Sequence, residues 1–407
     1  MSSRILPLLV LTSFLLTSCG GGGEKKKEKP NSKPSTKKSD PKSTTKKSKT
    51  VLAPKPGKPQ VKKAIFGKTA DGTEIDLYTC SNSNGLLFQI TNWGATIIRV
   101  ETPDKDNNLA NITLSFPALK GYENNPTYFG CTVGRYCNRI AKGEFKLDGK
   151  KYALPKNNGD HHLHGGPKGF HLAVWKLKET INKDGEVGVT MTYKSKDGEQ
   201  GYPGNVDVTA RYTLNDNNEL KMVFLAKTDK PTHVNLTNHC YWNLAGERSG
   251  TTLDHEVTIH ADKFLPVDKT LIPTGKYADY KQSPELDFTK PKAIGKDIKK
   301  IKADPQGYDH CYSLRSQDGK LALAAKVKDP KTGRVMEILT TQPGIQFYSG
   351  NFLDGSEKVQ GFKQYTGFCL ETQHYPDTPN QPEFPTTLLK PGETFQQTTV
   401  HRFSVEK

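Results

Sequence analysis

Closely spaced turn dipeptides are the feature of this 407-residue sequence that most restricts its fold. Asp-Gly pairs occur at residues 71–72, 148–149, 197–198, 318–319 and 354–355. Asp-Gly favours the type I′ turn, whose twist matches that of two paired strands. No long segment shows the uninterrupted apolar period of about 3.6 residues that is typical of a helix. The sequence therefore predicts an all-β body made of many short antiparallel strands.

The clearest expected hairpin runs from residue 143 to residue 154. Its two arms alternate apolar and polar residues on either side of Asp148-Gly149. Two further strand pairs are expected, 86–90 with 95–100 and 206–214 with 220–226. Because the strands are numerous and no fixed-period repeat is visible, we predict a large antiparallel sandwich rather than a propeller or a solenoid.

The charge of the chain is concentrated in one segment. The whole sequence has a formal net charge of +16, and residues 24–63, with 15 lysines, carry +12 of it. Residues 64–407 carry only +3. A nearly neutral body argues against a protein whose folded part binds nucleic acid.

The first residues are typical of an export signal. Arg4 is followed by an apolar stretch at 5–16, which is too short to span a bilayer as a stable helix. Small residues then precede Cys19. This pattern resembles the bacterial lipoprotein signal, in which residues 1–18 are removed and Cys19 becomes the lipid-bearing first residue. The expected location is outside the cytosol, lipid-anchored to a bacterial membrane and facing the periplasm or the exterior. An ordinary secretory signal with a cysteine near its cleavage site is the alternative.

Residues 19–63 are predicted to be a disordered tether that follows the lipid-bearing cysteine. The segment is rich in Gly, Lys, Ser and Pro and has almost no apolar residues, so it cannot bury enough surface to offset the entropy of ordering. We interpret it as a soluble spacer, with lysine binding to anionic lipid or acidic wall polymers as the alternative. Residues 64–407 are then the single folded domain.

Six cysteines remain in the predicted body. They are Cys80, Cys131, Cys137, Cys240, Cys311 and Cys369. No C-x-x-C pair occurs, so neither a zinc ribbon nor a thioredoxin motif is indicated. Buried free thiols are the default for cysteines in such apolar surroundings, and no disulfide connectivity is predicted.

Two motifs in the first half of the body contain candidate binding residues. In Gly-Arg-Tyr-Cys-Asn-Arg-Ile at 134–140, Arg139 can present its planar guanidinium to hydroxyls or a carboxylate, or can form a surface ion pair. In His-His-Leu-His-Gly-Gly at 161–166, three histidines suggest a metal, but the further ligands of a zinc site are not evident. The Gly-Gly pair suggests instead a tight loop that lets a ligand approach the backbone, with His164 as a polar binding residue or as a plain loop histidine.

Three motifs in the second half contain candidate acid–base residues. His239 lies among Asn, Tyr and Trp, where a proton donor or a structural histidine are both plausible interpretations. Asp309 lies in Tyr-Asp-His at 308–310, and Glu371 follows an apolar run. A carboxylate at an inner strand end is costly without a partner or a function. These separated residues in an all-β frame indicate acid–base chemistry on a carbohydrate without identifying the reaction.

Five motifs in the same order together resemble the aldose 1-epimerase (galactose mutarotase) family. They are 134–140, 162–166, 236–244, 308–310 and 371–380, and the resemblance covers about residues 65–405. It implies a β-supersandwich that interconverts the α and β anomers of free sugars without a metal or cofactor. On matching positions it implies Glu371 as general base and His239 as general acid. The sugar hydroxyls would be bound by Asn138, Arg139, His164 and Asp309.

Two other functions remain open at this point. An enzyme like glucose-6-phosphate 1-epimerase would need a cluster of cationic residues for the phosphate. A non-catalytic carbohydrate-binding surface lipoprotein would keep the aromatic residues but tolerate loss of Glu371 or His239. The sequence does not distinguish glucose from galactose, which differ at one hydroxyl, and it does not indicate an oligomeric state.

Overall fold

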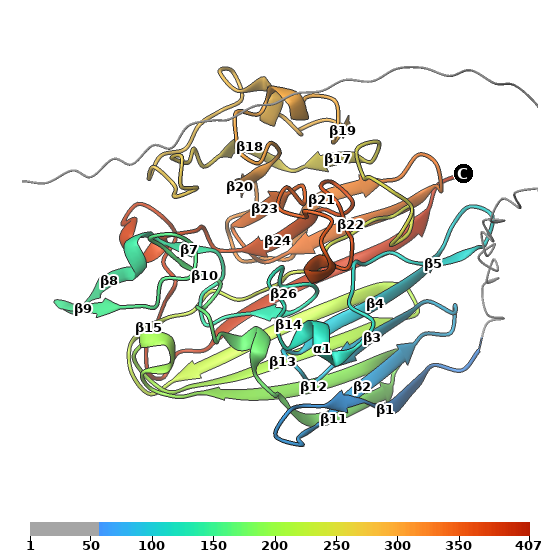
Figure 1. Ribbon diagram of the computed structural model, residues 1–407, viewed down its shortest axis with the longest axis horizontal. Helices are drawn as coiled ribbons and strands as arrows, with labels where there is room; N and C mark the ends of the chain where they lie inside the picture. The colour runs from blue at the N-terminus through green and yellow to red at the C-terminus, as the bar shows by residue number, and fades with distance from the viewer. Residues whose placement is uncertain (1–56) are drawn as a thin grey trace, which may run out of the picture. The chain divides into compact units, whose positions relative to one another are not determined.

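The computed structural model describes residues 57–407, and its largest sheet has nine antiparallel strands. In spatial order they are β11 (Lys176–Lys183), β12 (Glu186–Ser195), β13 (Val206–Asn215), β14 (Glu219–Thr228), β26 (Phe395–Val405), β22 (Arg334–Thr340), β21 (Ala322–Lys328), β17 (Glu256–Ile259) and β19 (Lys292–Ala293). The C-terminal strand β26 pairs with β14 on one side and β22 on the other, so it joins the two halves of the sheet (Figure 1).

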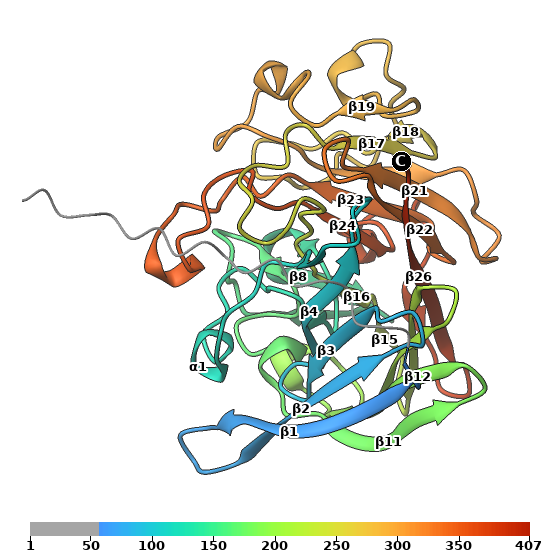
Figure 2. The same cartoon turned by 90° about the vertical axis from the view of Figure 1, so that its right-hand side faces the viewer.

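Two smaller sheets pack against this large one. The five-stranded sheet is β1 (Gln60–Lys68), β2 (Glu74–Ser81), β3 (Leu87–Thr91), β4 (Thr96–Pro103) and β5 (Leu109–Asn111). It lies beside β11 and β12 (Figure 2). The four-stranded sheet is β18 (Ala261–Phe264), β20 (Asp309–Leu314), β23 (Gly344–Tyr348) and β24 (Cys369–Gln373). The predicted large antiparallel sandwich is confirmed.

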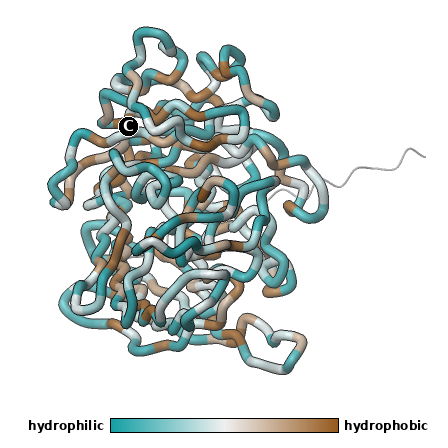
Figure 3. The backbone as a smooth tube through the Cα atoms, turned by 90° about the vertical axis from the view of Figure 1, so that its left-hand side faces the viewer, coloured by the Kyte–Doolittle hydropathy of each residue, from teal (hydrophilic) through white to brown (hydrophobic). Residues whose placement is uncertain are grey.

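One apolar core connects the three sheets. Phe88 of β3, Tyr212 of β13, Met336 of β22 and Phe347 of β23 all belong to it and are fully buried. Hydrophilic residues predominate along many of the outer loops (Figure 3). Because successive side chains of a strand point to opposite faces, every second residue of a core strand faces away from this core.

Short elements connect the sheets and hold the loops between them. The two-stranded pairs are β6 (Thr132–Val133) with β16 (Thr237–Asn238), β7 (Arg139–Ile140) with β10 (His162–Leu163), β8 (Glu144–Leu147) with β9 (Lys150–Ala153), and β15 (Thr232–His233) with β25 (Leu388–Leu389). The helical elements are α1 (Leu119–Tyr122) and single 3₁₀ turns at Ala141–Gly143, Phe170–Leu172, Glu199–Gly201, Pro284–Leu286, Ile298–Lys300, Glu357–Val359 and Thr378–Asn380. Within residues 57–407, no helix has the length and apolar character needed to cross a membrane.

The strand pairs expected from the sequence are confirmed. β8 and β9 form the predicted hairpin, and the turn residues Asp148 and Gly149 both have the positive φ of a type I′ turn, at 49° and 74°. β3 pairs with β4, and β13 pairs with β14, both antiparallel. The six body cysteines are buried and free, as expected.

The predicted end of the tether at residue 63 is wrong. β1 begins at Gln60 and pairs with β2, with Gln60 opposite Ser81. Lys62 and Lys63 are exposed on this strand, and β1 lies at the edge of its sheet. Lysines are common on edge strands because they oppose further pairing, so a lysine-rich composition did not exclude a strand here. The predicted signal peptide, Cys19 and the tether up to residue 56 lie outside the described residues.

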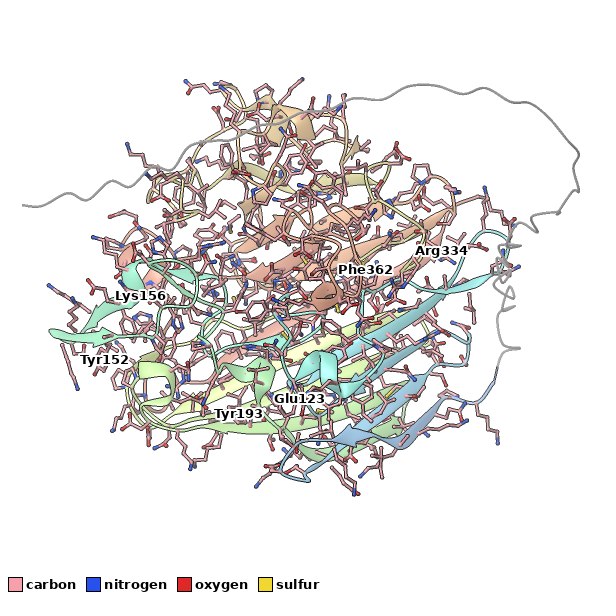
Figure 4. All side chains as sticks on the ribbon, viewed as in Figure 1. Glu123, Tyr152, Lys156, Tyr193, Arg334 and Phe362 are labelled. Carbon is pink, nitrogen blue, oxygen red and sulfur yellow. The ribbon has the colours of Figure 1, made fainter. Side chains whose placement is uncertain are left out.

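A buried arginine fastens the large sheet to the five-stranded one. Arg334 of β22 is 3% exposed, and Figure 4 labels it near β4 and β5. Its guanidinium donates to the backbone carbonyls of Thr102, Asn108 and Leu244 at 2.8–3.2 Å. Arginine can satisfy several acceptors at once because its five N–H groups have a fixed planar arrangement. This contact fixes the two sheets relative to each other around one end of the core.

Gly130 connects β4 to the segment that contains His239. Its N–H donates to the carbonyl of His239 at 3.0 Å, and its own carbonyl accepts from Ile97 at 2.9 Å. Its φ is +64°, and a Cβ at this position would lie 1.8 Å from the carbonyl oxygen of Ile97. The close approach of the two segments therefore requires a glycine.

We predict that Gly130→Ala lowers the free energy of unfolding by about 3 kcal/mol or more, because strain and a backbone clash add together. Gly72→Ala is the matched control, since Gly72 also has a positive φ, +86°, but nothing lies within 4 Å of its Cβ position. The control should cost only about 1–2 kcal/mol. Urea unfolding of both variants measures the difference, and equal costs would contradict the packing described.

Candidate active site

The four-stranded sheet presents two rows of polar and sulfur-containing side chains on one face. Register places Asp309, Tyr348 and Cys369 opposite one another, and Cys311, Gln346 and Glu371 opposite one another in the next row. Residues directly opposite in a sheet share a face, and so do residues two apart along a strand. The alternate residues, among them Phe347 and Leu370, point into the core. Glu371, in contrast, points away from the core and lines a pocket.

His239 follows β16 and is held by backbone hydrogen bonds on both sides. Its N–H donates to the carbonyl of Cys131 at 2.9 Å, and its carbonyl accepts from Gly130. The imidazole Nε2 lies 3.6 Å from Oε1 of Glu371, and both side chains are at most 5% exposed. Its Nδ1 lies 3.6 Å from Sγ of Cys369. The ring is thus placed between a carboxyl group on one side and a thiol on the other.

Arg139 and Asp309 form the other side of the site. Nη2 of Arg139 lies 3.8 Å from Oδ2 of Asp309, and their side chains are 8% and 12% exposed. Arg139 also donates from Nε to Oδ1 of Asn158 at 3.1 Å. Gln346 donates to Oδ1 of Asp309 at 2.6 Å. The surface ion pair considered for Arg139 is therefore wrong, because the pair is largely buried and its members keep free donor and acceptor positions for a ligand.

Two residues of the site have a left-handed backbone. Asn138 has φ +60° and His164 has φ +51°, which is uncommon for residues other than glycine and tends to occur at functional sites. The N–H of Asn138 donates to Nδ1 of His164 at 3.1 Å. Because Nδ1 accepts this bond, the neutral ring has its proton on Nε2. His164 is therefore a hydrogen-bond donor.

The Gly-Gly pair after His164 has a structural reason that differs from the one expected. A Cβ at Gly165 would lie 1.9 Å from the carbonyl oxygen of Gly134, so the close approach is by backbone and not by a ligand. His162 does not join His164 on one side of a strand, since β10 ends at Leu163. His162 is buried, where it accepts from the hydroxyl of Tyr202 at 2.8 Å.

These residues surround one pocket of about 270 Å³. All six residues singled out from the sequence line it, namely Asn138, Arg139, His164, His239, Asp309 and Glu371. Tyr241 also lines it, whereas Trp242 packs in the core against the ring of His401 at 5.0 Å and cannot stack on a ligand. A volume of this size suits one monosaccharide-sized ligand.

Other lining residues were not found from the sequence. Tyr128 packs its ring 4.6 Å from His164 and 5.8 Å from His239, measured between ring centroids. Tyr348 and Phe352 complete the wall. No motif marked any of these aromatic residues, and only the alternation in β23 could have placed Tyr348 on the same face as its neighbours.

Burial shifts the pKa values of the two central residues in opposite directions. Burial and the nearby Asp309 carboxylate raise the pKa of Glu371 well above its usual value, and Arg139 opposes this shift. Burial lowers the pKa of His239 to about 4. Burial therefore favours the neutral form of each group, a protonated carboxyl group and a neutral imidazole.

Three potential metal ligands meet in the pocket. One donor atom each from His164, His239 and Glu371 lies within 4.8 Å of the others. However, His164 accepts a backbone bond at Nδ1, so its Nε2 has a proton where a metal ligand needs a free lone pair. Burial also lowers the pKa of His164 well below its usual value, so the ring is neutral. The donor set fits the hydroxyls of a sugar better than a cation.

The comparisons with known proteins agree with this geometry. A family model described as aldose 1-epimerase matches residues 76–402. The chain belongs to the aldose 1-epimerase family. The galactose mutarotase of Bos taurus is 45% identical over 348 residues, which cover 85% of this chain and 99% of the relative. The aldose 1-epimerase of Escherichia coli K12 is 34% identical over 346 residues, covering 83% and 97%.

Solved structures of epimerases share the fold. The aldose epimerase homologue from C. elegans has a TM-score of 0.74 at 30% identity and covers 80% of this chain and 98% of its own. The galactose 1-epimerase from Lactobacillus acidophilus has a TM-score of 0.75 at 27% identity and covers 86% and 100%. The predicted family and its β-sandwich are confirmed.

We predict that two charge-removing substitutions shift the acid limb of kcat/KM in opposite directions. The base form of Glu371 is gained as pH rises through its raised pKa, so activity of the epimerase should rise there. Asp309→Asn removes a negative neighbour, lowers the pKa of Glu371 and moves the limb to lower pH. Arg139→Met removes a positive neighbour and moves it to higher pH. Each shift should be about one pH unit.

The measurement is the pH profile of kcat/KM, which reports groups of the free enzyme. Both variants should also raise KM, because each removes a polar group from the lining of the pocket. Shifts of the two limbs in the same direction would contradict the assignment of the limb to Glu371.

Proposed function

We propose that this enzyme interconverts the α and β anomers of free aldohexoses such as glucose and galactose. One observation carries the proposal: a buried carboxyl group and a buried imidazole lie 3.6 Å apart in the lining of a monosaccharide-sized pocket. Arg139 and Asp309 line the same pocket, and their charged groups suit sugar hydroxyls. Anomer exchange needs one base and one acid around the same carbon.

The reaction follows from the positions of the two groups. Glu371, as the carboxylate, accepts the proton of the anomeric hydroxyl, and His239 donates its Nε2 proton to the ring oxygen. The bond between the anomeric carbon and the ring oxygen breaks, and the carbonyl of the open-chain aldose forms. Rotation about the next carbon–carbon bond exposes the other face, and the ring closes with both protons returned. No electrons or atoms are exchanged with a cofactor.

The free oxygen of Glu371 supports its role as base. Its Oε2 is buried and has no hydrogen-bond partner among the described residues. A buried acceptor without a partner is costly, and a ligand hydroxyl in the pocket would satisfy it. A titratable group with a strongly shifted pKa in a cleft is also the usual property of a catalytic residue. This arrangement favours catalysis over simple carbohydrate binding.

The charge of the pocket favours an uncharged sugar. Among the described residues that line the small pocket, Arg139 is the only arginine or lysine, and Asp309 lies beside it. A phosphate group would meet two carboxyl groups and one cation that is already paired. The sugar-phosphate alternative therefore has little support.

We expect Glu371→Gln to lower the rate of anomer exchange by about 10²–10⁴-fold, because an amide cannot accept the proton. Glu337→Gln is the matched control, since Glu337 lies on β22 beside Arg402, far from the pocket lining. Polarimetry of freshly dissolved α-D-glucose and α-D-galactose with the full chain measures both variants. Wild-type protein that leaves the spontaneous rate of both sugars unchanged would refute the proposed function.

We further propose that the enzyme is exported and attached to a bacterial membrane through a lipid on Cys19. The support is the sequence pattern around that residue. Expressed in a bacterium, the wild-type chain should sediment with membranes, and Cys19→Ser should be released into the soluble fraction. Equal distribution of the two proteins would argue for an ordinary secretory signal.

A further inference from the structure

The imidazole of His239 has a second contact, which the proposed reaction does not use. Its Nδ1 lies 3.6 Å from Sγ of Cys369, and among residues 57–407 this thiol is the only hydrogen-bond partner of Nδ1. Cys369 is fully buried and does not belong to the lining of the pocket. It therefore does not touch a bound sugar, and any effect that it has on the reaction must pass through the imidazole.

A single strand supplies a partner for each nitrogen of the ring. Cys369 and Glu371 are two residues apart in β24, so their side chains point to the same face of the sheet. Glu371 lies 3.6 Å from Nε2, and Cys369 lies at the same distance from Nδ1. The imidazole of His239 thus spans two neighbouring positions on one strand.

Aromatic contacts define the plane of the imidazole but not its rotation within that plane. The ring of Tyr241 stacks on that of His239, with centroids 5.2 Å apart and an angle of 28° between the planes. The ring of Tyr128 lies 5.8 Å away at 31°. A rotation of 180° about the Cβ–Cγ bond would keep this plane and exchange each nitrogen with a carbon. Stacking is therefore compatible with both orientations, and contacts at the ring edge must select one.

The chemistry of the thiol indicates which of the two partners donates. Burial and the nearby Glu371 raise the pKa of Cys369 well above its usual value, so the sulfur keeps its proton. Sulfur is a weak acceptor, whereas one nitrogen of a neutral imidazole accepts readily. Another buried thiol, that of Cys131, likewise donates to the backbone carbonyl of Tyr128 at 3.2 Å. In the contact with His239, the S–H group therefore donates and Nδ1 accepts.

We propose that Cys369 is a positioning residue that holds His239 with its proton on Nε2 and with Nε2 toward the substrate. A neutral imidazole has one N–H group, so a donor at Nδ1 leaves the proton on Nε2. In the proposed reaction, this is the proton that the ring oxygen of the sugar receives. The thiol keeps its own proton throughout and adds no chemical step. The inference rests on the proposed function and adds to it a residue that acts only through the acid.

The position of the proton can be measured without any activity. Nitrogen-15 spectra of the full chain, labelled at histidine, separate ring nitrogens that have a proton from those that have none. The signals of His239 are identified as those that His239→Gln removes. Wild-type protein at neutral pH should have this proton on Nε2. Cys369→Ala should shift the Nδ1 signal toward that of a nitrogen without a donor, and Cys369→Ser should reverse the shift, because a hydroxyl also donates.

The kinetics of anomer exchange measure the consequence for the reaction. Cys369→Ala should lower kcat about tenfold, the effect of losing one hydrogen bond that orients the acid, and should leave KM within about twofold. Cys369→Ser should restore kcat to within about threefold of the wild-type value. Cys80→Ala is the matched control, because Cys80 is also fully buried but lies on β2 in the main core. It should leave kcat unchanged.

The possible outcomes separate this inference from the proposed function. A proton on Nδ1 of His239 in the wild-type protein would overturn the inference, because the thiol would then be the acceptor. A kcat of Cys369→Ala equal to that of the wild type, or a Cys369→Ser variant as slow as Cys369→Ala, would overturn it as well. Absence of anomer exchange by the wild-type protein would refute the proposed function, and the spectra would still show whether Cys369 orients the ring.

Discussion

The pairing of a buried carboxyl group with a buried imidazole is the constraint on which the site depends. Glu371 and His239 come from segments 132 residues apart, and each is almost fully buried. Burial disfavours the charged form of both, so it raises the pKa of the carboxyl group and lowers the pKa of the imidazole. A sugar that offers a hydroxyl to the carboxyl oxygen and a ring oxygen to the imidazole supplies the missing partners. The burial that disfavours charge in the empty site therefore also shifts the pKa values of both groups, and such shifts are typical of residues that transfer protons.

The sandwich provides this pair by using the two faces of one sheet differently. Phe347 and Leu370 of the four-stranded sheet anchor it in the core, while Glu371 and Asp309 on the alternate positions face the pocket. Segments next to the short strand pairs contribute Asn138 and His164 to the same pocket. Both residues have a left-handed backbone, which sets the direction of their side chains. Strands thus hold Glu371 and Asp309, a short strand holds Arg139, and positions just after short strands hold His164 and His239. Such a division places reacting groups accurately without a flexible element.

Much of this could be predicted from local sequence, and the remainder depends on contacts between distant segments. Asp148-Gly149 and its flanking alternation identify a hairpin because a turn and a period of two are local properties. The motif around Glu371 identifies a catalytic candidate for the same reason. In contrast, the contact of Cys369 with His239 and the bond from Gln346 to Asp309 depend on strand register, which only tertiary packing determines. Phe352 belongs to no recognisable motif. The lysines of β1 made the start of an edge strand resemble the lysine-rich tether.

The central claim is that Glu371 and His239 face the anomeric carbon, and a crystal structure of Glu371→Gln with bound galactose tests it most directly. The amide substitution should retain the sugar while preventing turnover. The account predicts the anomeric hydroxyl at position 371, the ring oxygen within hydrogen-bond distance of Nε2 of His239, and the remote hydroxyls toward Arg139 and Asp309. A sugar bound in the reverse orientation, with its anomeric carbon at Arg139 and Asp309 and away from Glu371, would contradict the account.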